Sequence, residues 1–91
     1  MTDVEIEAGI RKNYRVRKQR LLEAVQSEVV RTPEAPRSRG ETCAMCCLKE
    51  HGGGLFLYRQ RDGQELVVGK RCAQYLDYLR AHPNRVRELL S

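Results

Sequence analysis

The sequence predicts a small α+β domain, and three features of the chain lead to that prediction. Apolar residues recur at helical spacing through the first third of the chain, two strand-like runs flank an Asp-Gly pair in the second half, and helical patterns follow them. The 91 residues are 41% hydrophobic and 32% charged, with no Trp and one Phe. Because Phe and Trp normally supply the bulk of a small core, this core is expected to be aliphatic and thin. Such a core usually needs a metal ion, disulfides or a partner chain.

The first predicted element is a long, amphipathic and basic helix over residues 1–31. Thr2 followed three residues later by Glu5 is a capping box, which marks a helix start. Gly9 weakens the first turns, so the firm part of the helix is expected to begin near Ile10. The apolar stripe at helical spacing consists of Ile10, Tyr14, Leu21, Leu22, Val25 and Val29. Because a helix cannot bury such a stripe on itself, we expect it to pack on the rest of the chain or on a second copy, forming a homodimer.

A linker over residues 32–42 is expected to separate this helix from a second module over residues 43–91. The linker contains two prolines and a glycine and has no apolar periodicity. Each proline biases the residue before it away from the helical conformation. The segment is therefore predicted to be extended.

A β-hairpin is the next predicted element, with strands over residues 55–60 and 65–69. An Asp-Gly pair at positions 62 and 63 is the preferred centre of a two-residue hairpin turn. That turn would place Tyr58 opposite Val67 and Leu57 opposite Val68.

Two helices are predicted after the hairpin. The first covers residues 72–80, and one face carries Cys72, Tyr75, Leu76 and Leu79. Pro83 ends or kinks this helix, and Asn84 can cap a last short helix. The apolar residues of that short helix are Val86, Leu89 and Leu90.

Four cysteines in so short a chain are the strongest chemical signal. Cys43 and Cys46 are two residues apart, a spacing that lets a tight turn aim two thiolates at one Zn²⁺ ion, about 2.3 Å from each sulfur. Cys72 lies at the predicted start of a helix, where the helix dipole and free N–H groups stabilise a thiolate. The pattern therefore predicts a zinc site built from a turn and a helix start.

The order of cysteine turn, hairpin and helix over about residues 41–80 resembles the treble-clef, or zinc-knuckle type, zinc finger. The resemblance implies a structural Zn²⁺ ion held by four ligands. In that family the fourth ligand lies three residues after the third, where this chain has Tyr75. A small residue, often glycine, usually follows the second cysteine, where this chain has Cys47.

The fourth ligand is open between residues of this chain and a group from outside it. His51 is the first candidate, because the glycines after it leave the chain free to fold back. Cys47 is the alternative, although adjacent Cys46 and Cys47 side chains diverge in an extended chain. Two readings need no metal: the thiols are inert and packed like small apolar residues, or Cys43, Cys46 or Cys47 form a redox switch.

Positive charge is concentrated in two places, and the net charge of the chain is +5. The first, with no acidic residue among its ten positions, contains Arg11, Lys12, Arg15, Arg17, Lys18 and Arg20. The second contains Arg59, Arg61, Lys70 and Arg71. A solvated helix face usually mixes charges of both signs, so an unmixed block favours contact with the phosphates of nucleic acid.

The predicted function is a small zinc-binding regulatory protein that associates with nucleic acid, as in transcription regulation. One alternative is a zinc-stapled adaptor that docks on a larger machine through its N-terminal helix, with the basic block steering an acidic protein partner. Another is a thiol redox switch. An enzyme is not expected, because the sequence shows no Ser-His-Asp set, no carboxylate pair and no phosphate-binding loop.

A cytoplasmic protein without a membrane span is expected. No apolar run approaches the roughly 18 to 20 residues that cross a bilayer. The first residues are acidic and lack the apolar stretch of a secretory signal. Thiols stay reduced in the cytoplasm, where clustered cysteines more often bind metal than form disulfides.

Overall fold

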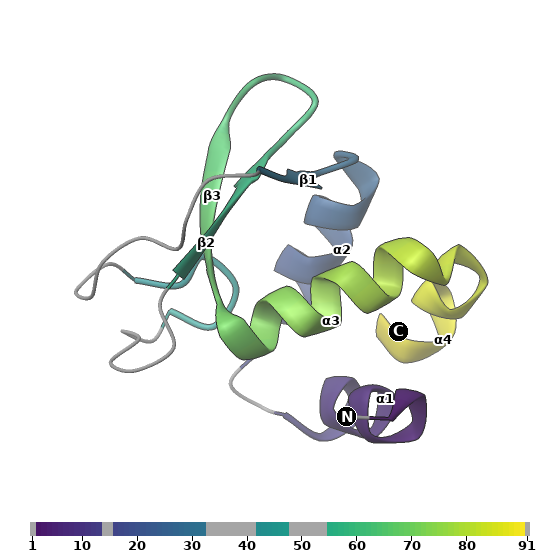
Figure 1. Cartoon of the computed structure of the whole chain (residues 1–91). Helices are drawn as coiled ribbons and strands as arrows, with labels where there is room; N and C mark the ends of the chain where they lie inside the picture. The colour runs from purple at the N-terminus through teal and green to yellow at the C-terminus, as the bar shows by residue number, and fades with distance from the viewer. Residues whose placement is uncertain (1, 14–15, 33–41, 48–54, 91) are drawn as a thin grey trace.

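The computed structural model describes residues 2–13, 16–32, 42–47 and 55–90. These residues form a small α+β fold with four α-helices, one 3-10 helix and a three-stranded antiparallel sheet of order β1-β2-β3. In chain order the elements are α1 (Asp3–Lys12), α2 (Lys18–Gln26), β1 (Val30–Arg31), β2 (Leu55–Arg59), β3 (Glu65–Gly69), α3 (Lys70–Ala81), η1 (Pro83–Arg85) and α4 (Val86–Leu90). Helix α3 runs through the centre, with α1 and α2 on opposite sides of it and the sheet at its N-terminal end (Figure 1). None of the helices described is long and apolar enough to cross a membrane.

The single long N-terminal helix predicted from the sequence is wrong, because the segment forms two helices. The backbone is extended at Asn13, which ends α1, and again at Arg17, which precedes α2. Between them Val16 is only 6% exposed and belongs to the core, and the Arg17 N–H donates to the Met45 carbonyl at 3.1 Å. These tertiary contacts interrupt a pattern that is helical in sequence.

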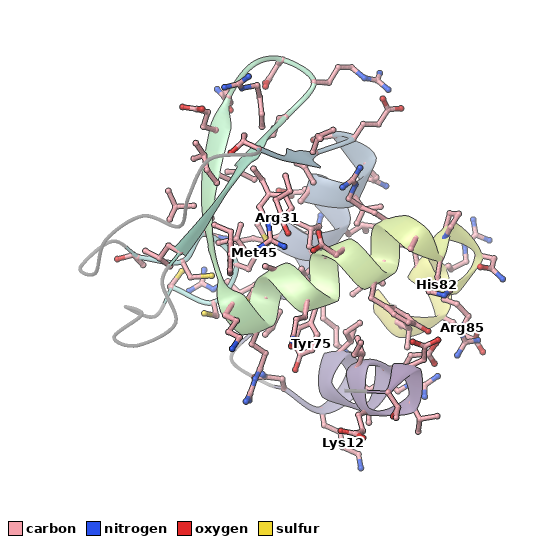
Figure 2. All side chains as sticks on the ribbon, viewed as in Figure 1. Lys12, Arg31, Met45, Tyr75, His82 and Arg85 are labelled. Atoms are coloured by element: carbon pink, nitrogen blue, oxygen red, sulfur yellow. The ribbon has the colours of Figure 1, made fainter. Side chains whose placement is uncertain are left out.

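The capping box at the start of α1 is confirmed, but the expected weakness at Gly9 is wrong. The Thr2 hydroxyl accepts a hydrogen bond from the Glu5 N–H at 3.3 Å, and the helix is continuous from Asp3. Gly9 instead permits close packing, because a Cβ atom there would lie 2.4 Å from the Tyr75 hydroxyl. Figure 2 shows Tyr75 pointing from α3 toward α1.

The predicted apolar stripe packs within this chain, although Leu22 and Val25 are only half-buried. Ile10, Leu21 and Val29 are fully buried, and they share one hydrophobic cluster with Leu76 and Leu79 of α3. Residues on both sides of the predicted linker therefore build one core, while positions 14 and 33–41 lie outside the described residues. A homodimer through this segment remains a prediction, now without an uncovered stripe among the described residues to drive it.

The hairpin forms as predicted, but its register differs by one residue. Leu57 pairs with Val67 and Tyr58 with Leu66, because the loop has three residues rather than two. The Gln60 N–H donates to the Gln64 carbonyl at 2.8 Å and closes that loop. Gly63 has φ +91°, which fits the last position of a three-residue loop with a bulge.

The third strand, β1, was not predicted, since its residues were assigned to the end of the long helix. Val30 pairs with Arg59 and Arg31 with Tyr58, so β1 extends the hairpin at the β2 edge. The Arg31 guanidinium lies 3.8 Å from the centre of the Phe56 ring and 3.5 Å from a carboxylate oxygen of Asp77 in α3. The Tyr58 hydroxyl also donates to Asp77, at 2.6 Å. These contacts hold the sheet against α3.

The C-terminal helices follow the prediction closely. Helix α3 begins two residues earlier than expected, and the four residues assigned to its apolar face are all buried: Cys72, Tyr75, Leu76 and Leu79. Asn84 lies inside η1 rather than acting as a helix cap. His82 ends α3, and its Nδ1–H donates to the Tyr78 carbonyl at 2.9 Å. Its ring stacks on the Tyr78 ring, with the ring centres 4.1 Å apart.

Helix α1 is tied to the C-terminal part of the chain by an ion pair. Arg85 donates to both carboxylate oxygens of Glu7, at 2.7 and 3.1 Å, and Tyr78 donates to the same carboxylate. Hydrogen bonds from Arg85 and Tyr78 hold the pKa of Glu7 at about 2, below its ordinary value of 4.5. The contact joins elements at opposite ends of the sequence.

Candidate metal centre

Three of the four cysteines come together where β3 meets α3. The sulfur atoms of Cys43, Cys46 and Cys72 all lie within 4.8 Å of one another. Cys43 is fully buried, Cys72 is 3% exposed and Cys46 is half-buried. Tetrahedral zinc with sulfur at about 2.3 Å separates the sulfurs by about 3.8 Å, so this cysteine cluster can hold a metal ion with small movements. Figure 2 shows the sulfur atoms gathered at this end of α3, near Met45.

The first two cysteines lie on a tight turn, residues 42–47, which we call the knuckle. The Cys47 N–H donates to the Cys43 carbonyl at 2.9 Å and closes the turn. Cys47 has φ +62°, the left-handed conformation that favours glycine. A cysteine in this conformation is strained, so the rest of the turn must hold it in place.

Hydrogen bonds from both sides fix the knuckle to the rest of the fold. The Ala44 N–H donates to the Val67 carbonyl of β3 at 2.8 Å. The Met45 carbonyl accepts from the Arg17 N–H, and the Ala44 carbonyl accepts from the Arg20 guanidinium at 2.7 Å. The turn that aims Cys43 and Cys46 is thus held by the sheet on one side and by α2 on the other.

The third cysteine is placed by the start of α3. Gly69 is the N-terminal cap of this helix, so Cys72 is its third residue and lies in the first turn, as the sequence predicts. The Gly69 N–H donates to the Cys43 sulfur at 3.2 Å, and the Met45 N–H donates to it at 3.4 Å. Backbone donors aimed at a sulfur are the arrangement that stabilises a thiolate.

Of Cys43 and Cys72, Cys43 is the thiol that loses its proton more readily. The pKa of Cys43 falls to about 5, chiefly because the Cys72 thiol donates a hydrogen bond to its sulfur, and further because backbone N–H groups do the same. The pKa of Cys72 is raised by that same hydrogen bond and by burial. A metal ion that binds all three sulfurs must displace the remaining protons, so its affinity depends on pH.

The candidate ligands divide into three groups. Cys43, Cys46 and Cys72 are brought together as predicted. Cys47 is exposed and is not a member of the cluster among the described residues, and His51 lies outside those residues. Tyr75, the position of the family's fourth ligand, is 3% exposed and lies against Gly9 of α1.

The predicted basic residues also divide, because several of them already have partners. Arg59 lies 3.2 Å from Glu65, Arg61 donates to Glu28 at 3.1 Å, and Arg20 is bound to the knuckle. Arg15 lies outside the described residues. The predicted basic residues whose side chains make no hydrogen bond or ion pair to another described residue are Arg11, Lys12, Arg17, Lys18, Lys70 and Arg71.

Four of these unpaired side chains flank the cysteine cluster. Arg17 and Lys18 lie at the start of α2, and Lys70 and Arg71 are the first two residues of α3. Both helix starts contact the knuckle directly, through the N–H groups of Arg17 and Gly69. Arg11 and Lys12 lie apart from them, in the last turn of α1.

Sequence reasoning missed the role of Arg20, which it assigned to a charged surface. Its contact with Ala44 joins positions 24 residues apart, and no local sequence pattern predicts such a bond.

No protein-family model, curated protein or solved structure matches this chain. The treble-clef assignment therefore remains a prediction that rests on the order of knuckle, hairpin and helix.

Proposed function

We propose that this protein is a small zinc-binding protein that associates with nucleic acid. The observation that carries the proposal is the cysteine cluster between two helix starts, each of which bears basic side chains without a described partner. Soft thiolate ligands favour zinc among the common divalent ions, and the burial of Cys43 and Cys72 suits a structural site.

The fourth zinc ligand is assigned to His51 in this proposal, with Cys47 as the alternative. A histidine nitrogen is a common partner for three thiolates in structural zinc sites. Two separate variants, His51→Ala and Cys47→Ala, decide the assignment when the zinc content of the purified protein is measured. The variant that loses zinc identifies the ligand, and retention by both would assign the fourth position to a group from outside the chain.

The nucleic-acid surface in this proposal is formed by the four flanking basic residues, Arg17, Lys18, Lys70 and Arg71. Three of them are exposed and Lys18 is half-buried. Both pairs lie at the N-terminal end of a helix, where the helix dipole favours anions such as phosphate. Metal binding would hold both helix starts in position through the knuckle.

The test is the salt dependence of binding to duplex DNA, single-stranded DNA and RNA. The slope of log affinity against log salt is expected to be near −0.9 for each phosphate neutralised on duplex DNA. The double variants Arg17→Gln/Lys18→Gln and Lys70→Gln/Arg71→Gln should each flatten the slope by about one unit per lost contact.

The matched control is Arg59→Gln/Arg61→Gln, which removes two positive charges that already pair with Glu65 and Glu28. It should leave the slope nearly unchanged. If the control variant flattens the slope as much as the test variants do, the proposed nucleic-acid surface is wrong. If the protein binds none of the three nucleic acids at low salt, the nucleic-acid function is wrong and an acidic protein partner becomes the better candidate.

A further inference from the structure

A pocket of about 410 Å³ lies between α2, the knuckle and the hairpin loop. Its volume falls in the roughly 300–1,000 Å³ range of small-ligand sites. The side chains around it come from three segments that are far apart in the sequence. Helix α2 contributes Ser27, the knuckle contributes Met45, and the hairpin contributes Gln60 and Gln64.

The polar groups of this pocket are available to a ligand. The side chains of Gln60, Gln64 and Ser27 make no hydrogen bond to another residue in the described part of the chain. Each of them can both donate and accept. Side-chain amides form paired hydrogen bonds with the edges of nucleobases, and hydroxyl groups contact either kind of base-edge atom.

Three apolar residues also line the pocket: Ala24, Met45 and Leu66. Ala24 and Met45 are only 3% and 2% exposed, whereas Leu66 is half-buried and offers the larger apolar surface. A thioether is polarisable and makes favourable contacts with aromatic rings. A flat heteroaromatic ring can therefore contact these side chains while its edge meets the amides.

The charges at the pocket favour a neutral ligand over a phosphate. Arg20 and Glu23 both line it, and both already have partners. Arg20 donates to the Ala44 carbonyl, and Glu23 accepts from Gln19 at 3.2 Å. Positive charge without a described partner begins one turn earlier, at Arg17, where it would meet the phosphate next to a bound base.

We infer that this pocket binds one unstacked base of a single-stranded nucleic acid. The inference rests on the proposed function and names the form of nucleic acid that the protein takes. A base inside a duplex is stacked and paired, so it cannot place its edge in the pocket, whereas a base in a single strand can. RNA and single-stranded DNA offer the same base chemistry.

The experiment compares strands with and without bases. Binding of the zinc-loaded protein is measured by fluorescence anisotropy, at low salt, to an oligonucleotide of about 10 nucleotides and to an abasic strand of equal length. Ribose and deoxyribose versions of both strands show whether the protein binds RNA or single-stranded DNA more tightly. The strand with bases should bind about 10-fold more tightly, which corresponds to about 1.4 kcal/mol.

The variant Gln60→Leu/Gln64→Leu should reduce that difference to near unity, because it keeps the side-chain volume and removes both amides. The matched control Gln26→Leu/Gln74→Leu changes two glutamines that do not line the pocket and should keep the difference. Backbone amide shifts provide a second readout on the unmodified protein. Residues 44–45 and 60–64 should respond to the strand with bases and not to the abasic strand.

Equal affinity for the two strands would overturn the base pocket and leave nucleic-acid association standing. A difference that survives the Gln60→Leu/Gln64→Leu change would also overturn it. Failure to bind either strand would overturn the proposed function together with this inference.

Discussion

Arg20 is exposed, and it positions the knuckle of the candidate metal centre. Its guanidinium donates to the Ala44 carbonyl at 2.7 Å and joins α2 to the turn that carries two of the three clustered cysteines. Hydrogen-bonding partners that orient the ligands of a metal typically contribute 10- to 100-fold to its affinity. Because Arg20 holds the backbone of the knuckle and not a sulfur, an effect at the lower end is expected.

The variant Arg20→Gln should weaken zinc binding by about 10-fold, as measured by competition with a chromophoric chelator. The control is Lys18→Gln, which removes a neighbouring positive charge with no contact to the knuckle among the described residues. Equal zinc affinities for Arg20→Gln and the unmodified protein would contradict the positioning role.

Gly9 illustrates how packing reverses an expectation based on helix propensity. Alanine is favoured over glycine inside a helix by about 1 kcal/mol. A Cβ atom at this position would lie 2.4 Å from the Tyr75 hydroxyl and 3.0 Å from two ring carbons. The ring is 3% exposed, so it has little room to move away. Overpacking of this kind typically costs about 1–3 kcal/mol.

We therefore expect Gly9→Ala to lower the free energy of unfolding by about 1 kcal/mol, measured by urea denaturation. The closest contact is with a hydroxyl, so Tyr75→Phe should recover part of that loss when combined with Gly9→Ala. A double-mutant cycle isolates this coupling. An increase in stability on Gly9→Ala alone would show that the ring moves freely.

At the scale of elements, two predictions from sequence fail for related reasons. The break between α1 and α2 depends on a hydrogen bond between Arg17 and Met45, which are 28 positions apart. Helical periodicity describes only local spacing, so it cannot predict this bond. The Asp-Gly pair is compatible with hairpin loops of two and three residues. The register follows from Gly63 taking the positive φ at the end of the longer loop.

Helix α1 is held in place by a contact whose strength depends on pH. Glu7 accepts from Arg85 and Tyr78, and its pKa of about 2 lies below the ordinary value of 4.5. In the unfolded chain the carboxylate binds a proton more readily than in the folded chain, so this contribution to stability is complete above about pH 4.5. It is lost as the pH falls toward about 2.

The variant Glu7→Gln should therefore be less stable than the unmodified protein near neutral pH, and the difference should shrink in acid. Urea unfolding of both proteins across this range measures it. The control Glu5→Gln changes a carboxylate that accepts a hydrogen bond from the Thr2 hydroxyl in the first turn. A gap between the Glu7→Gln variant and the unmodified protein that stays constant with pH would contradict the ion-pair account.

At the scale of the whole molecule, the sequence was most informative about the cysteine cluster. The two-residue spacing of Cys43 and Cys46 is local, and the place of Cys72 in the first turn of α3 follows from helix periodicity, so both parts of the cluster could be predicted. The basic residues could be identified from the sequence, but which of them form ion pairs could not be predicted, because the pairing of Arg59 and Arg61 depends on contacts across the fold. The pocket beside the knuckle could not be predicted at all, since three separate segments form it.

The cysteine cluster lies where several elements of the fold meet, so loss of a bound metal ion is expected to affect all of them. The knuckle contacts β3, α2 and the junction of β3 with α3, so the cluster links elements from both halves of the chain. Structural zinc in finger peptides contributes roughly 10–16 kcal/mol. That is comparable to or larger than the whole stability of a typical domain, about 5–15 kcal/mol. The core is not purely aliphatic, because Tyr58, Tyr75 and Tyr78 are buried in it, but it is small and is therefore expected to depend on the ion.

The most direct test of this account is native mass spectrometry of the purified protein, before and after treatment with a strong chelator, with far-UV circular dichroism on the same samples. The account predicts one zinc ion per chain and loss of folded structure over residues 43–80 when the ion is removed. The triple variant Cys43→Ser/Cys46→Ser/Cys72→Ser should behave like the chelated protein. A metal-free chain with the same folded structure and stability as the untreated protein would contradict the central claim.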